Sequence, residues 1–140
     1  MKILIAVDGS AYTKRMIGYV TAHDELFGPA QEYTVLTVVP AVPPRAAAAI
    51  DKQTLTDYYA DEAEKVLKPV RTFLEKQGLK VKATYKVGSP GDVIPKTATA
   101  GKFDMVVMGS HGHSALGSLV LGSVAVKVLA NCKVPVLLVR

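Results

Sequence analysis

The chain has 140 residues, of which 49% are hydrophobic and 21% are charged. This length and composition suit one folded globular domain and exclude a disordered or fibrous chain. The formal net charge is +5, but Lys and Arg are scattered without a run of five or six like charges, so we expect no nucleic-acid partner. No stretch approaches the ~20 apolar residues of a membrane span, and the opening apolar run is too short for a signal peptide. We therefore expect no membrane span and a cytoplasmic location.

Short apolar strands alternate with helices from the start of the chain. Lys2–Val7 is a continuous apolar run, which predicts a strand buried on both faces. Ser10 is a candidate N-cap for a helix that we expect to reach about Leu26. Tyr33–Val39 is rich in β-branched residues and predicts a second buried strand.

A long helical pattern occupies the middle of the chain. The apolar segment Ala46–Ile50 has no strong period, and we expect it to be a loop. From Asp51 to about Gln77, apolar residues recur at spacings of three and four, which predicts a helix. Pro69 lies inside this pattern, so we expect a kink or a break near Lys68.

The last part of the chain continues the alternation. Leu79–Val87 alternates apolar and charged residues, which indicates a strand near an edge of the sheet with one face in water. Ser89 is a candidate N-cap for a helix to about Ala100. Two more strands are predicted at Phe103–Met108 and Val134–Val139, with a helix that begins at Gly122-Ser123 between them.

This β-α-β-α-β-α-β-α-β order predicts an α/β domain over residues 1–140, with a parallel sheet, right-handed crossovers and helices on both faces. In such sheets ligands bind beyond the carboxyl ends of the strands. Asp8 leaves the first strand and Gly109 leaves the fourth. If these two strands are neighbours, both residues face the same crevice.

The segment after the fourth strand has the parts of a phosphate site. It reads Gly109-Ser110-His111-Gly112, then nine residues, then Gly122-Ser123. Glycine allows backbone amides to approach a phosphate closely, and the amides and dipole of a helix start favour an anion. The hydroxyl of Ser123 adds a donor.

The spacing Gly-x2-Gly-x9-Gly-Ser closely resembles the ATP-binding signature of the universal stress protein family. Three further segments resemble that family in register, so the resemblance covers the whole chain. They are Ile3–Ser10, the Gly88-Ser89-Pro90-Gly91-Asp92-Val93-Ile94 turn, and the last strand with its preceding residue, Lys133–Val139.

The resemblance implies a sheet of order 3-2-1-4-5 and an ATP-binding protein that acts as a regulatory module in a stress response. It implies a base pocket beside Ala6 and Val7, a ribose near Asp8, an adenine edge at the Val38 backbone, and a nucleoside packed on Met108. The same resemblance assigns ribose and phosphate contacts to Gly109, Gly112, Gly122, Ser123 and Val124. Mg²⁺ or Mn²⁺ would be carried by the phosphates, and many family members form homodimers through the last strand, here Val134–Val139.

Several alternatives stay open. Asp8 can simply cap the turn that follows it. His111 and His113 are weak metal ligands at this spacing, and either can be exposed or contact phosphate. The chain has no Gly-x4-Gly-Lys-[Ser/Thr] and no Gly-x-Gly-x-x-Gly after the first strand, which excludes a P-loop or dinucleotide site. We identify no catalytic residue, and the alternative functions are slow ATP hydrolysis in the same site or a nucleotide-free interaction protein.

Overall fold

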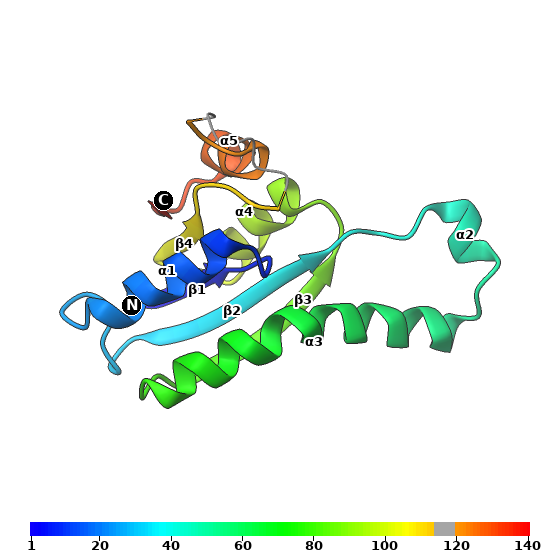
Figure 1. The fold of residues 1–140 in the computed structure, drawn as a ribbon. Coiled ribbons are helices and arrows are strands. Elements are labelled where there is room, and N and C mark those ends of the chain that lie inside the picture. Colours follow the sequence, from blue (N-terminus) through cyan, green and yellow to red (C-terminus); the bar gives the residue numbers. More distant parts are fainter. Residues whose placement is uncertain (114–119) are drawn as a thin grey trace.

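The computed structural model describes residues 1–113 and 120–140 of the chain. Residues 114–119, which include Ser114, Gly117 and Ser118 of the predicted glycine loop, lie outside the described residues. Within the described part, five parallel strands form one sheet in the order β3-β2-β1-β4-β5 (Figure 1). The strands are β1 (Lys2–Ala6), β2 (Glu32–Val39), β3 (Val81–Val87), β4 (Met105–Gly109) and β5 (Val136–Val139). The helices are α1 (Ala11–Ala22), α2 (Pro44–Ala48), α3 (Lys52–Lys76), α4 (Pro90–Ala100) and α5 (Ser123–Asn131). The predicted α/β class and strand order are confirmed.

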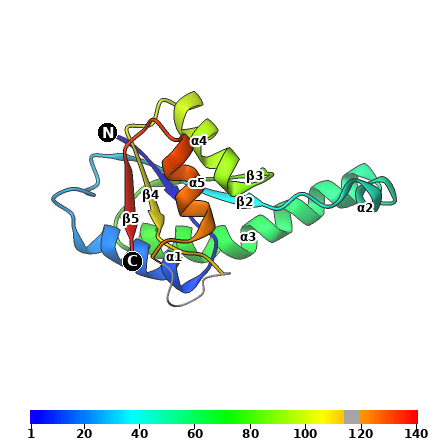
Figure 2. The ribbon, with the colours of Figure 1, turned by 90° about the horizontal axis from the view of Figure 1, so that it is seen from above.

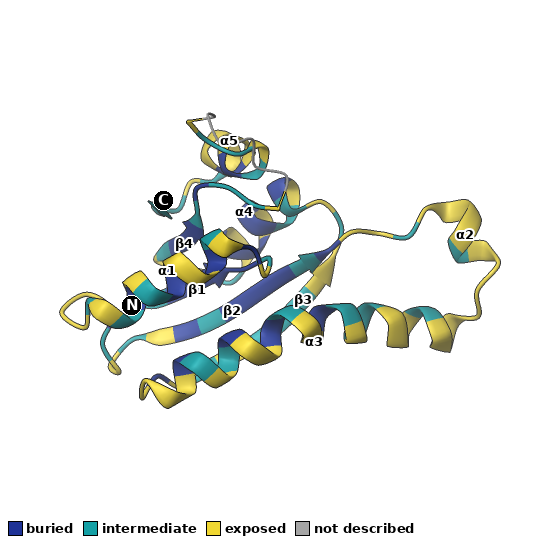
Figure 3. Ribbon diagram, in the orientation of Figure 1, coloured by how far each residue is buried: buried dark blue, intermediate teal, exposed yellow. Residues whose placement is uncertain are grey.

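Each face of the sheet buries its own hydrophobic cluster. Side chains of a strand alternate between faces, so Ile3 and Ile5 pack with α1 and α3, whereas Leu4 and Ala6 pack with α4 and α5. Figure 3 shows the buried residues concentrated on the strands and on the sides of the helices that face them. The continuous apolar run of β1 therefore reflects burial on both faces, as predicted.

Two helix predictions are wrong in detail. α1 ends at Ala22 rather than near Leu26, because the Leu26 and Phe27 amides bond to the carbonyl of His23 and the chain turns there. The segment predicted as a loop at Ala46–Ile50 is largely helical, since α2 spans Pro44–Ala48. A proline is compatible with the first turn of a helix, where its missing N–H has no partner to lose.

The sequence predicts a kink or a break near Lys68 because of Pro69. No break occurs, since α3 continues as one helix from Lys52 to Lys76. Pro69 lies on the exposed side of the helix, while Leu67 and Val70 beside it are buried in the core. Packing on the sheet side therefore holds the helix together across the missing N–H.

α2 and the first turns of α3 project from the body as an arm (Figures 1 and 2). Most residues of this arm are exposed. Asp51 caps α3, because its carboxylate accepts from the Thr54 amide and hydroxyl, each at 2.8 Å. The Tyr59 hydroxyl accepts a hydrogen bond from the Val42 amide at 2.9 Å, which ties the two sides of the arm together.

The two edges of the sheet are β3 and β5. The predicted edge position of β3 is confirmed, with Ala83 and Tyr85 packed on the core and Lys82 exposed. Ser10 and Ser89 occupy the predicted N-cap positions of α1 and α4, but neither hydroxyl makes a capping hydrogen bond. The Ser10 amide instead donates to Asp8, which gives Asp8 the capping role in that turn.

No helix among the described residues is long and apolar enough to cross a lipid bilayer.

Candidate nucleotide site

The carboxyl ends of β1 and β4 lie side by side, with Ala6 paired to Met108. The turns that leave these strands therefore meet, as predicted for Asp8 and Gly109. A cavity of about 640 Å³ opens at this edge of the sheet. That volume lies within the range of about 300–1,000 Å³ usual for small-molecule sites. All ten residues proposed from the sequence border this cavity: Ala6, Val7, Asp8, Val38, Met108, Gly109, Gly112, Gly122, Ser123 and Val124.

The β1–α1 turn fixes the Asp8 carboxylate. Its Oδ1 accepts from the Ser10 amide and from the Thr13 hydroxyl, both at 2.9 Å, and the Asp8 amide donates to Thr13 Oγ1 at 3.0 Å. Gly9 adopts a left-handed φ of +78°, which allows the chain to reverse between strand and helix. Asp8 therefore caps this turn, which was the alternative role considered from the sequence. It also borders the cavity.

Gly112 lies directly against this carboxylate. A Cβ placed on Gly112 would be 2.6 Å from Asp8 Oδ2, so only glycine fits there without movement. The imidazole of His113 continues the contact, because its Nε2 lies 2.6 Å from the Asp8 carbonyl oxygen and can donate to it. The segment after β4 is therefore closely apposed to the β1–α1 turn at the mouth of the cavity.

The start of α5 is held next to the end of β4. The Gly122 amide donates to the carbonyl of Ser110 at 2.8 Å, and a Cβ on Gly122 would lie 3.0 Å from His111 Cα. Gly122 is the N-cap of α5 and Ser123 is its first helical residue, so the first amides of a nine-residue helix open beside the cavity. Unbonded amides and the helix dipole favour a negatively charged group at this position.

The backbone of β2 offers a pair of hydrogen-bonding groups at the opposite wall. Successive residues of a strand direct their N–H and C=O toward alternate neighbours. The Leu36 carbonyl faces β1, where it accepts from the Val7 amide, and the Val39 carbonyl faces β3, where it accepts from the Gly88 amide. Val38 therefore directs its N–H and C=O toward β1, which has already ended at Ala6.

Several cavity residues were not predicted from the sequence, among them Thr13, Glu62 and Val66. Thr13 follows from the turn chemistry, since a buried threonine five residues after Asp8 can reach back to it. Glu62 and Val66 come from α3, and only the tertiary position of that helix brings them to the cavity. Among the described lining residues, the charged or titratable side chains are two carboxylates and two histidines, with no lysine or arginine. Outside residues 114–119, no group of three or more His, Cys, Asp or Glu side chains forms a metal cluster.

Comparison with known proteins identifies the family of this fold and motif. The model of the universal stress protein family matches residues 1–140. The chain belongs to that family. A universal stress protein of Thermus aquaticus is 34% identical over 99% of this chain and 97% of its own length. Universal stress proteins MJ0531 and MJ0577 of Methanocaldococcus jannaschii are 33% and 36% identical, but the aligned segments span only 52% and 53% of those relatives.

Solved structures of universal stress proteins share the fold. The structure of MJ0577 superposes with a TM-score of 0.81 and 31% identity over 99% of this chain and 94% of its own. A universal stress protein from Archaeoglobus fulgidus in complex with dAMP has a TM-score of 0.71 and 21% identity, over 100% of this chain and 98% of its own. Structures at 17% and 19% identity carry AMP, in an Arabidopsis thaliana protein, and cAMP.

Proposed function

We propose that the chain is one ATP-binding domain in which the cavity beyond β1 and β4 holds the nucleotide. The observation that carries this proposal is that the ten residues assigned from the sequence, which come from four separate segments of the chain, all border one cavity of about 640 Å³. Relatives of the same fold hold AMP, dAMP and cAMP, which supports an adenine nucleotide as the ligand class.

The base would lie against β2. The Val38 N–H and C=O, directed past the end of β1, match the ring-nitrogen acceptor and exocyclic amine donor of adenine. Guanine carries a donor and an acceptor at the corresponding positions, so it would place donor against donor and acceptor against acceptor. Unsatisfied buried polar groups cost about 1–3 kcal/mol each, so this edge would select adenine. Ala6, Val7 and Met108 would supply the apolar contacts to the nucleoside, and Asp8 would accept from the ribose hydroxyls.

The phosphates would lie between Gly112 and the start of α5. Gly109, Gly112 and Gly122 keep this region free of side chains, and Ser123 and Val124 would offer amides and a hydroxyl. Since no described lining residue is a lysine or arginine, a divalent ion such as Mg²⁺ or Mn²⁺ would accompany the phosphates and offset their charge. The protein would hold that ion through the nucleotide rather than through a cluster of its own.

The regulatory part of the proposal concerns the edge of the sheet next to the site. α5 begins at the proposed phosphate position, and its outer face exposes 53% of Val126 and 44% of Leu129. β5 follows directly and is an uncovered edge strand, and an apolar edge strand favours pairing with another chain. We propose that Val134–Val139 pairs with a second copy of the chain, so that nucleotide binding and the dimer surface share one helix. A cytoplasmic role in a stress response is part of the same proposal.

The test is the nucleotide content of the purified protein, released by denaturation and identified by chromatography. We compare the wild type with Gly122→Val, whose side chain would collide with the backbone of His111 and Ser110. Gly18→Val is the matched control, because a Cβ on Gly18 has no neighbour within 4 Å. ATP in the wild type and in Gly18→Val, but not in Gly122→Val, is the expected result. A wild type that contains no nucleotide and fails to bind added ATP would refute the proposal.

A further inference from the structure

A second cavity lies between α1 and α3, on the face of the sheet that these two helices cover. Its volume is about 440 Å³, again within the range of about 300–1,000 Å³ usual for ligand sites. In Figure 1, α1 and α3 cover the same face of the sheet, and β2 is seen between them in this view. None of the residues predicted from the glycine signature borders this groove.

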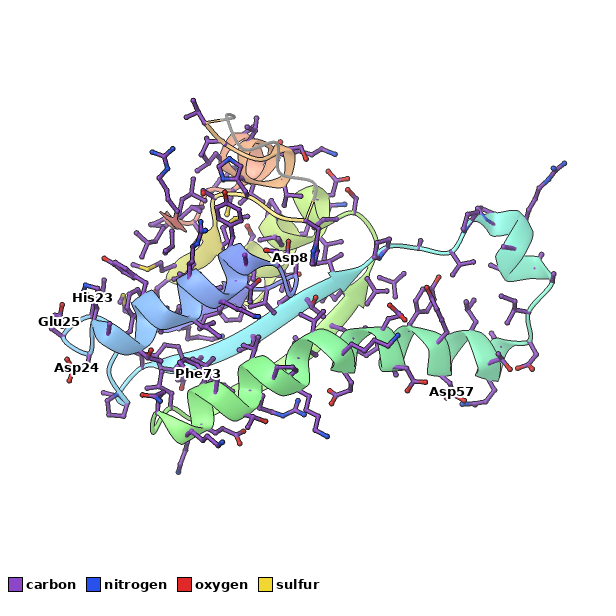
Figure 4. The ribbon with its side chains drawn as sticks, viewed as in Figure 1. Asp8, His23, Asp24, Glu25, Asp57 and Phe73 are labelled. Atoms are coloured by element: carbon purple, nitrogen blue, oxygen red, sulfur yellow. The ribbon has the colours of Figure 1, made fainter. Side chains whose placement is uncertain are left out.

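The lining of the groove changes character along its length. Both helices run from the carboxyl edge of the sheet toward the amino edge, as crossovers between parallel strands require. Thr13, Lys14 and Lys65 line the end nearer the nucleotide cavity. Ile17 is one turn further along α1, and Val70 and Phe73 are one to two turns further along α3. Figure 4 shows Phe73 on α3, far from Asp8 and toward the opposite edge of the sheet. The groove is therefore cationic and polar at one end and apolar at the other.

The charge at the cationic end is not fully compensated. Lys65 Nζ pairs with Glu62 Oε1 at 2.7 Å, which leaves little net charge on that pair. Lys14 is exposed and forms no ion pair within residues 1–113 and 120–140. The groove thus combines one uncompensated ammonium group with an apolar channel.

We propose that this groove is a second ligand site that binds an unbranched fatty carboxylate. The carboxylate would pair with Lys14, and the alkyl chain would lie along Ile17, Pro69, Val70 and Phe73. A neutral apolar ligand would gain nothing from Lys14, and a short organic anion would leave the apolar end open to water. An amphiphile with one anionic head satisfies both ends of the groove.

The groove is separate from the nucleotide cavity but shares a wall with it. Thr13 and Val66 border both spaces, and a Cβ on Gly9 would lie 3.3 Å from a Val66 methyl group. The site does not depend on the proposed nucleotide function, so it is tested on nucleotide-free protein. The experiment must nevertheless distinguish a chain in this groove from one in the larger cavity.

The test is calorimetric titration of the full chain with decanoate and hexanoate. Decanoate is expected to bind at one site, with about a fourfold loss of affinity for each methylene removed from the chain. Lys14→Gln is expected to weaken decanoate about 1.4- to 5-fold, as for a solvent-exposed ion pair. Lys96→Gln, an exposed lysine of α4 on the other face of the sheet, is the control and should bind as the wild type does.

A second pair of variants tests the apolar end. Pro69 is exposed inside α3, so Glu and Ala are both compatible with the helix at this position. Pro69→Glu puts a carboxylate beside the alkyl chain and should weaken decanoate at least tenfold, whereas Pro69→Ala should keep the wild-type affinity. Circular dichroism of each variant verifies folding. Absence of decanoate binding by the wild type overturns the proposal. Decanoate binding that is unchanged in both Lys14→Gln and Pro69→Glu would put the alkyl chain outside this groove and overturn the proposal equally.

Discussion

Replacement of Gly112 by alanine should weaken ATP binding without unfolding the protein. The added methyl would lie 2.6 Å from Asp8 Oδ2, about an ångström inside an ordinary contact. The carboxylate cannot simply rotate away, because Oδ1 accepts from the Ser10 amide and the Thr13 hydroxyl at 2.9 Å. In the free protein the segment after β4 can relieve the contact by moving outward. Nucleotide binding would then have to restore the close approach, at the overpacking cost of about 1–3 kcal/mol.

That cost corresponds to a loss of affinity of about 5- to 150-fold. The assay is titration of a fluorescent ATP analogue, with thermal unfolding of the same samples. Gly18→Ala is the matched control, since its methyl meets nothing within 4 Å and it lies inside α1. This control should bind ATP normally and should be more stable by about 0.5–1 kcal/mol, the usual gain for alanine over glycine in a helix. A Gly112→Ala protein that binds as tightly as the wild type would show that the Gly112–Asp8 approach has no part in binding.

Three other predictions follow from single contacts. His113→Ala removes the bond from Nε2 to the Asp8 carbonyl, which holds the segment after β4 against the β1–α1 turn, and should weaken ATP about 2- to 13-fold; an unchanged affinity would contradict this. Burial raises the pKa of Tyr33 to about 12, so its contribution to stability should be complete below about pH 10 and lost as the pH rises toward 12. The free energy of unfolding, measured with denaturant from pH 8 to 11.5, should fall more steeply with pH in the wild type than in Tyr33→Phe. The same pH dependence in both proteins would refute this prediction. The Thr54 hydrogen bonds lower the pKa of Asp51, so Asp51→Ala should speed amide exchange in the first turn of α3 at neutral pH, and the difference should vanish as acid protonates Asp51; equal exchange rates at neutral pH would contradict the capping role.

The sequence predicts the sheet well because burial on two faces leaves a clear pattern. β1 and β4 are continuous apolar runs, and the charged alternation of β3 marks it as an edge. The predicted last strand, Val134–Val139, is longer than the observed β5, which begins at Val136. Val134 and Pro135 precede the paired residues of β5, although the Val106 amide still donates to the Pro135 carbonyl. Composition alone does not distinguish such a lead-in from a strand.

The helices are predicted less well where local preference and packing disagree. Pro69 predicts an interruption of α3, but the helix is continuous because its neighbours Leu67 and Val70 are packed in the core. The alanines of α2 favour a helix, but the segment has no amphipathic period, and for that reason the sequence predicts a loop. The period is absent because α2 has no buried residue and therefore needs no apolar face.

The candidate site was largely predictable because its parts follow directly after strands or begin a helix. Asp8, Gly109 and Gly122 are positions that topology alone brings to one edge of a parallel sheet. Glu62 and Val66 could not be placed in this way, since they lie in the middle of a long helix whose tilt across the sheet is set by packing. The groove between α1 and α3 has no sequence signature at all, because it results from the distance between two helices.

The most direct test of the proposed nucleotide site is calorimetric titration of nucleotide-free protein with ATP and with GTP. Binding of one ATP per chain, with GTP at least 30-fold weaker because guanine mismatches both backbone groups of Val38, is the predicted result. Equal affinity for the two nucleotides would contradict the proposed role of Val38, and no binding of either would contradict the nucleotide site itself.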